Sequence, residues 1–123
     1  MKLAVIITSD PGAGDDGLGR AFLGMALAAE AKHAGDEVDL VFAGAGTRWP
    51  AALTKLDHPL NGLYSAVRDT VRGASCGCAD VFGAADGLEA CGVPKLDDHA
   101  LPGTSGIVAL RRYVADGWQT QVF

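Results

Sequence analysis

KLAVIIT, at residues 2–8, opens the stretch of sequence that decides the fold. This continuous, largely β-branched run predicts a strand that is buried on both faces. EVDLVFAG, at residues 37–44, predicts a second strand. One β-α-β unit in this order implies two parallel strands that are joined by a right-handed crossover. The helix between the strands is indicated by apolar residues at helical spacing: Leu18, Phe22, Met25 and Ala29.

Small residues on this predicted helix would let it lie close against the sheet, and Gly35 is placed to end it. These small residues are Ala21, Gly24 and Ala28. Further along, a helix is expected after Pro59, a short strand at RGASCG (72–77), and another helix from about Ala79. The apolar stripes of these two helices are Leu60, Leu63, Tyr64, Val67 and Val71, and then Val81, Phe82, Ala85 and Leu88.

The last third of the chain predicts less regular structure. PKLDDHALPG (94–103) holds a very short strand at most, and WQTQVF (118–123) alternates like an edge strand. Between them, TSGIVALRRYVADG (104–117) predicts a helix whose stripe is Ile107, Leu110 and Val114. The whole order predicts a single α/β domain over residues 1–123, with three α/β/α layers, a mainly parallel five-stranded sheet and flavodoxin-like topology. Functional sites in such sheets form in the loops after the carboxyl ends of the strands.

Composition narrows the classes of function. The net charge is −5 and no Lys/Arg stripe is present, which argues against a nucleic-acid partner. No segment approaches the roughly 20 apolar residues that cross a membrane, and the apolar start is too short for a signal peptide. We therefore expect a cytoplasmic protein without a membrane partner. The three cysteines are expected to be reduced in that compartment.

The glycines of the first loop spell G-x-G-x-x-G at Gly12, Gly14 and Gly17, between a strand and a helix. This is the context of a dinucleotide-binding loop. However, Asp15 and Asp16 would face an incoming pyrophosphate at the helix N-terminus. The simpler interpretation is that the glycines permit the turn while one of these aspartates caps the helix. No Walker loop is present, and no cofactor is expected.

Cys76 and Cys78 lie one residue apart in SCGCADVFG (75–83). The spacing suits neither a zinc site, which needs about four ligands, nor an unstrained disulfide, since their Cα atoms would be about 6.5–7 Å apart in a strand. In a turn the two residues could be closer, which leaves a strained, reversible Cys76–Cys78 bond open. A strand end followed by a helix start instead favours one exposed thiol, because the helix dipole stabilises a thiolate. The alternative is that both are small core residues. For Cys91, which extends a helical stripe, that alternative is the expectation.

At these residues the chain resembles the DsrE/DsrF-like family of small sulfur-transfer proteins, which includes the TusD-type relay proteins. The resemblance covers nearly the whole chain. It rests on MKLAVIITSDP, AFLGMALAAEAKHAGDEVDLVF, SCGCADVFGA and GIVALRRYVADGWQTQVF in this order. It implies a homo-oligomer, a trimer or a hexamer, and a cysteine that carries sulfur as a persulfide. Cys76 best matches the relay type and Cys78 matches other members, so the choice between them stays open.

The leading hypothesis is therefore a cytoplasmic, sulfurtransferase-like sulfur carrier that uses Cys76 or Cys78 and exchanges sulfur with a donor or acceptor protein. Ser9, Asp10 and His99 are expected in neighbouring loops as accessory residues, with His99 assisting proton transfer. No metal is expected. Two alternatives have the same fold: a small-ligand or nucleotide-binding module that uses the glycine loop, and a non-catalytic assembly protein with buried thiols.

Overall fold

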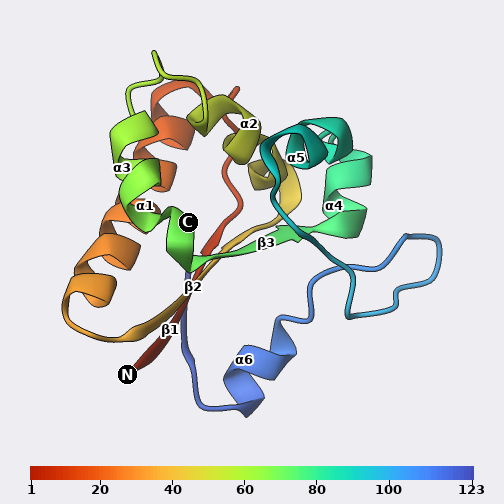
Figure 1. Cartoon of the computed structure of the whole chain (residues 1–123). Helices are drawn as coiled ribbons and strands as arrows, with labels where there is room; N and C mark the ends of the chain where they lie inside the picture. Colours follow the sequence, from red (N-terminus) through yellow and green to blue (C-terminus); the bar gives the residue numbers. More distant parts are fainter.

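The computed structural model describes residues 1–123, and its sheet has five strands, all parallel, in the order β4-β3-β2-β1-β5 (Figure 1). The strands are β1 (Lys2–Ile7), β2 (Glu37–Phe42), β3 (Val71–Ser75), β4 (Lys95–Leu96) and β5 (Gln119–Val122). The helices are α1 (Gly14–His33), α2 (Trp49–Leu53), α3 (Asn61–Val67), α4 (Cys76–Val81), α5 (Ala85–Cys91) and α6 (Arg111–Ala115), with 3-10 turns at Gly44–Arg48 and Arg68–Thr70.

The predicted three-layer, flavodoxin-like α/β architecture is confirmed. Flavodoxin itself has the strand order 2-1-3-4-5, so the likeness is one of architecture, with helices on both faces of a parallel sheet. The predicted strands at residues 2–8, 37–44 and 118–123 are present, and the last lies at an edge of the sheet as expected. No helix combines the length and the apolar character that crossing a bilayer requires.

The main core lies between one face of the sheet and helices α1 to α5, and it holds 19 buried residues. Alternation along β1 sends Leu3, Val5 and Ile7 into this core. Helix α1 approaches closely, because its buried face is made of small residues. A Cβ at Gly24 would lie 3.1 Å from Cγ1 of Ile7, so the side chain of Ile7 or the helix would have to shift by a few tenths of an ångström to accommodate it.

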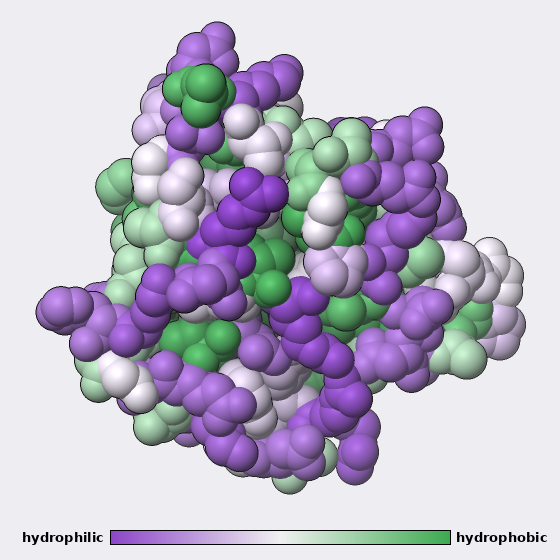
Figure 2. All heavy atoms as spheres, in the orientation of Figure 1, coloured by the Kyte–Doolittle hydropathy of each residue, from purple (hydrophilic) through white to green (hydrophobic).

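The opposite face of the sheet is covered by a single helix, α6, together with the segment 97–110 that leads to it (Figure 1). Its apolar cluster has 6 buried residues, among them Ala4 and Ile6 of β1 and Tyr113 of α6. On the face shown in Figure 2, polar side chains cover much of the surface and apolar ones form small, separate groups. With 6 buried residues against the 19 of the main core, this second layer is much thinner than the first.

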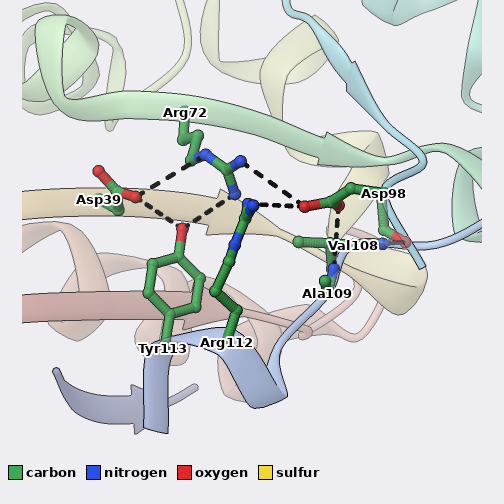
Figure 3. Close-up of polar contacts among 8 residues, drawn as sticks. Asp39, Arg72, Asp98, Val108, Ala109, Arg112 and Tyr113 are labelled. Carbon is green, nitrogen blue, oxygen red and sulfur yellow. Dashed lines mark hydrogen bonds and ion pairs between the residues drawn. The ribbon is translucent and has the colours of Figure 1, made fainter. Parts of the chain in front are cut away.

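Polar contacts supplement this thin apolar layer (Figure 3). The Tyr113 hydroxyl donates to Oδ2 of Asp39 at 2.7 Å, and Nη1 of Arg72 lies 3.4 Å from the same hydroxyl. Asp98 accepts from Nη2 of Arg112 at 2.6 Å and from the backbone N–H of Ala109 at 3.0 Å. We call these residues the α6 network. It joins β2, β3, the start of the segment 97–110 and α6.

Four details of the predicted helices are wrong. Phe22 is 49% exposed, because the smaller Ala21, Gly24 and Ala28 form the buried face of α1. Val71 begins β3 and does not extend the preceding helix. The helix expected from Ala79 begins at Cys76, and its stripe is interrupted at Gly83, whose φ is +67°, so that Val81 is exposed.

The fourth error concerns the helix predicted within residues 104–117, which is helical only at Arg111–Ala115. Gly106 has a φ of +94°, and Ile107 exchanges two backbone hydrogen bonds with His99 instead of making helical ones. As a result, Leu110 and Val114 are exposed, and Tyr113 is the residue that α6 buries.

The α6 network makes a prediction about Tyr113, one of the two tyrosines of the chain. Burial, followed by the hydrogen bond to Asp39, raises the pKa of Tyr113 to about 12 from its ordinary 10.0. The protonated hydroxyl therefore stabilises the fold below pH 10, and this contribution is lost as the pH rises towards 12. Tyr113→Phe should lower the free energy of unfolding at pH 8 by about 1–2 kcal/mol. Urea unfolding should also show a weaker loss of stability between pH 10 and 12 in the variant; an equal loss would contradict this account.

Tyr64, the other tyrosine, provides the matched comparison. The Tyr64 hydroxyl is buried and has no hydrogen-bond partner. Removing an unpartnered buried hydroxyl relieves its desolvation cost, so Tyr64→Phe should leave stability unchanged or raise it by up to about 1 kcal/mol. The same urea unfolding at pH 8 measures it, and a loss of stability as large as that of Tyr113→Phe would show that Tyr64 has an important polar contact.

Candidate functional site

Cys76 is the first residue of α4 and directly follows the carboxyl end of β3. Ser75 before it is fully buried, and its Oγ accepts the backbone N–H of Val108 at 3.1 Å. Gly77 after it donates its backbone N–H to the carbonyl oxygen of Gly106 at 2.7 Å. A Cβ at Gly77 would lie 3.0 Å from that same oxygen. The small residues around the cysteine therefore let the segment 97–110 pack directly on the first turn of α4.

This packing brings three polar side chains together, which we call the Cys76 triad: Cys76, Asp80 and Ser105. Sγ of Cys76 lies 3.3 Å from Oγ of Ser105, and the same hydroxyl donates to Oδ2 of Asp80 at 2.6 Å. A carboxylate only accepts hydrogen bonds, so the single hydroxyl hydrogen of Ser105 points to Asp80. The thiol of Cys76 is then the donor to Ser105.

One cation lies near the triad. The hydrogen bond to Glu89 is the largest cause that raises the pKa of Lys95 of β4, and nearby Asp80 contributes to the same direction. That bond joins Nζ of Lys95 to Oε1 of Glu89 at 2.9 Å. The ammonium group is therefore directed to Glu89 and makes no hydrogen bond to the thiol.

The triad borders a hollow of about 310 Å³ between α4 and the segment 97–110. Its lining is Gly77, Asp80, Val81, Gly103, Thr104 and Ser105. A second hollow of about 450 Å³ shares Gly103, Thr104 and Ser105 with it and extends to Asp97 and Leu101. The hollows are thus lined by Asp80 and Ser105, the two partners of the cysteine, and Cys76 itself lies behind them with part of its surface open to solvent.

The other two cysteines lie elsewhere. All three are free thiols. Cys78 follows Cys76 by two positions on a helix, where successive residues are about 100° apart, so the two side chains leave α4 on different sides. The strand predicted at residues 72–77 ends at Ser75, so both cysteines lie on the helix. Cys91 ends α5, packs partly buried against the main core as predicted, and lies 3.6 Å from the carbonyl oxygen of Leu88.

The predicted accessory residues do not join the triad. Ser9 donates its hydroxyl to the carbonyl oxygen of Gly17 and accepts Nε1 of Trp49 on its own carbonyl at 2.7 Å, so it supports the first loop. His99 forms backbone hydrogen bonds with Ile107 and lines a separate hollow beside α6. Neither forms a hydrogen bond with a cysteine.

Asp10 is linked to α4 indirectly. Its carboxylate accepts the backbone N–H of Gly12, which is the main reason that its pKa is lowered, and it pairs with Nη1 of Arg48 at 3.1 Å. Arg48 in turn donates from Nε to the carbonyl oxygen of Phe82, directly after α4. Asp10 therefore acts through Arg48 on the position of α4 and makes no contact with Cys76.

The glycine loop has its own internal bonds. Asp10 accepts the backbone N–H of Gly12 on its carboxylate and that of Ala13 on its carbonyl, so these two amides are already used. Asp15 and Asp16 lie in the first turn of α1, but no side chain caps this helix, which corrects the predicted cap. No three His, Cys, Asp or Glu side chains converge to hold a metal ion.

Two residues of the triad were not identified from the sequence. Asp80 lies four positions after Cys76, the spacing that places two side chains on one helix face, so a helix start at Cys76 would have pointed to it. Ser105 is 29 positions away and belongs to a segment that was expected to be helical. No local pattern indicates that it meets Cys76.

Comparison with known proteins supports the fold over its whole length. No family model matches the chain, and no curated protein matches its sequence. Among solved structures, the chain is similar to a conserved protein of unknown function from Bacteroides thetaiotaomicron, with a TM-score of 0.62 and 16% identity. The match covers 99% of this chain and 94% of the other. At this level of identity the likeness shows the fold alone.

The position of the cysteines on α4 makes a prediction about oxidation. Helical geometry separates the side chains of Cys76 and Cys78, so the folded protein should not form an intramolecular disulfide between them. After brief treatment with diamide and alkylation, mass spectrometry should find both residues of the monomer as alkylated thiols. The control is the same treatment in denaturant, where α4 is lost and Cys76 and Cys78 are free to form a disulfide. A peptide lighter by about 2 Da from folded monomer would contradict the prediction.

Proposed function

We propose that the protein is a sulfur carrier that holds a persulfide on the sulfur of Cys76. The observation that carries the proposal is the Cys76 triad: a partly exposed thiol at the start of α4, hydrogen-bonded to a hydroxyl, beside an open hollow. The resemblance to sulfur-transfer proteins in SCGCADVFGA also supports it. Cys76 is preferred to Cys78, because Cys78 makes no side-chain hydrogen bond and leaves α4 on a different side.

The proposed step is a transfer of a sulfur atom without net oxidation. The Cys76 thiolate attacks the outer sulfur of a donor persulfide, R–S–SH. A new S–S bond forms between Cys76 and that outer sulfur as the S–S bond of the donor breaks, and the electron pair of the broken bond leaves with R–S⁻. The proton that the Cys76 thiol released to water is balanced by the proton that R–S⁻ takes up. Attack by an acceptor thiolate on the outer sulfur then returns Cys76.

The proposal includes the setting in which the carrier works. A cytoplasmic location, where thiols stay reduced, agrees with three free cysteines. A homo-oligomer, a trimer or a hexamer, would need apolar contact surface. Leu23 of α1 and Val122 of β5 supply candidates, since they are 59% and 64% exposed and line the same shallow hollow. The sulfur donor and acceptor are proposed to be proteins.

The test is direct detection of the carried sulfur. The protein is incubated with cysteine persulfide, desalted and digested without reductant, and peptides are examined for a gain of one sulfur atom, about 32 Da. We expect the gain on Cys76 in the unchanged protein and in Cys78→Ala and Cys91→Ala, and its loss in Cys76→Ala. A second incubation with a thiol acceptor should remove it.

The two alanine variants outside the triad serve as matched controls for folding and for non-specific sulfuration. If no cysteine gains a sulfur atom, the carrier proposal fails. A gain on Cys78 that persists in Cys76→Ala would transfer the role to Cys78 and overturn the assignment made here.

A further inference from the structure

The carboxylate of Asp80 makes no ion pair, although it lies beside an open hollow and one turn from the reactive cysteine. Its hydrogen bond within the triad is the one from Ser105, at 2.6 Å. A short bond of this kind to an ionised acceptor is stronger than one between neutral groups. The hydroxyl hydrogen is therefore held on Asp80 and is turned away from Cys76.

This orientation has a chemical consequence for the sulfur. With its hydrogen on Asp80, Oγ of Ser105 offers Cys76 an acceptor, which suits a thiol and not a thiolate. The observed orientation of the Ser105 hydroxyl therefore matches the thiol, which is the unreactive form.

We propose that Asp80 and Ser105 form a latch that holds Cys76 as a resting thiol, and that a cationic side chain of the sulfur-delivering protein opens it by pairing with Asp80. In the open state Asp80 keeps its negative charge but accepts from the partner's Lys or Arg. The Ser105 hydroxyl then turns to donate its hydrogen to the Cys76 sulfur, and the thiol proton leaves to water. The inference rests on the proposed role of Cys76 as the sulfur-bearing residue.

The charges around the hollow favour binding of a cationic side chain from a partner protein. Asp80 lines it directly, and Asp97 lines the neighbouring hollow that shares its wall. Lys95 of β4 lies near the triad, but Glu89 of α5 already pairs with it at 2.9 Å. Val81, which is 73% exposed, adds an apolar contact beside Asp80. A basic residue next to an apolar one on the partner therefore matches this surface.

The latch is tested by the rate at which iodoacetamide alkylates Cys76, since alkylation needs the thiolate and no persulfide. Rates are measured from pH 6 to 9 in a Cys78→Ala/Cys91→Ala background, so that only Cys76 reports. Asp80→Asn and Ser105→Ala should each react faster at pH 7, Asp80→Asn by roughly tenfold, because removing the carboxylate's charge favours the thiolate. Their pH–rate profiles should move to lower pH.

Two further variants separate the latch from a general effect of surface charge. Asp80→Glu keeps the acceptor and the charge, so it should stay close to the slow rate. Asp97→Asn removes one nearby negative charge that contacts no cysteine, so it should also stay slow. Thermal melting of each variant shows that it is folded. The latch is overturned if Asp80→Asn or Ser105→Ala alkylates at the unchanged rate, or if Asp97→Asn accelerates alkylation as much as Asp80→Asn does.

Opening by a cation is tested with the peptide trilysine, and trialanine is the control. Trilysine should accelerate alkylation of the protein with Asp80 and should have no further effect on Asp80→Asn; equal effects on both would overturn the role of the cation. The two proposals can fail separately. Sulfur gain on Cys76 with no effect of Asp80→Asn would leave the carrier and remove the latch, whereas faster alkylation without any sulfur gain would leave the latch and remove the carrier.

Discussion

The hydrogen bonds of the Asp98 carboxylate hold the second layer of the domain in place, and the candidate site depends on that layer. Five helices and 19 buried residues make one layer, whereas a five-residue helix and 6 buried residues make the other. Asp98 binds Ala109 and Arg112, so it joins the beginning of the segment 97–110 to its end and to α6. Ser105 lies between these points, and the bonds of Gly106 to Gly77 and of Val108 to Ser75 then place it beside Cys76.

Most of the sheet could be predicted from the sequence because its strands are decided locally. KLAVII and EVDLVF are apolar runs of strand length, and the small residues of α1 indicated its close approach to the sheet. The errors fall where distant contacts override local periodicity. Ile107, Leu110 and Val114 have helical spacing, but the bonds of Ile107 to His99 and of Val108 to Ser75 replace the helix that the spacing indicates.

The candidate site was predictable only in part for the same reason. Cys76 could be placed at a strand end and a helix start, because the small residues around it and the following apolar residues are neighbours in sequence. The partners of its sulfur could not. Asp80 can be identified only once α4 is known to begin at Cys76. Ser105 lies beside Cys76 because a segment without regular structure packs there. By contrast Ser9, Asp10 and His99 do lie in strand-end loops, yet their bonds serve those loops.

The unequal thickness of the two layers divides the molecule into parts of unequal local stability. We expect the amide hydrogens of β1, β2 and α1, which pack on the large core, to exchange with solvent through global unfolding. We expect those of α6 and the segment 97–110, which rest on a small apolar cluster and a few polar bonds, to exchange through openings that leave the rest folded. Each such opening carries Ser105 away from Cys76. The environment of the sulfur is thus governed by the least stable cooperative unit of the protein.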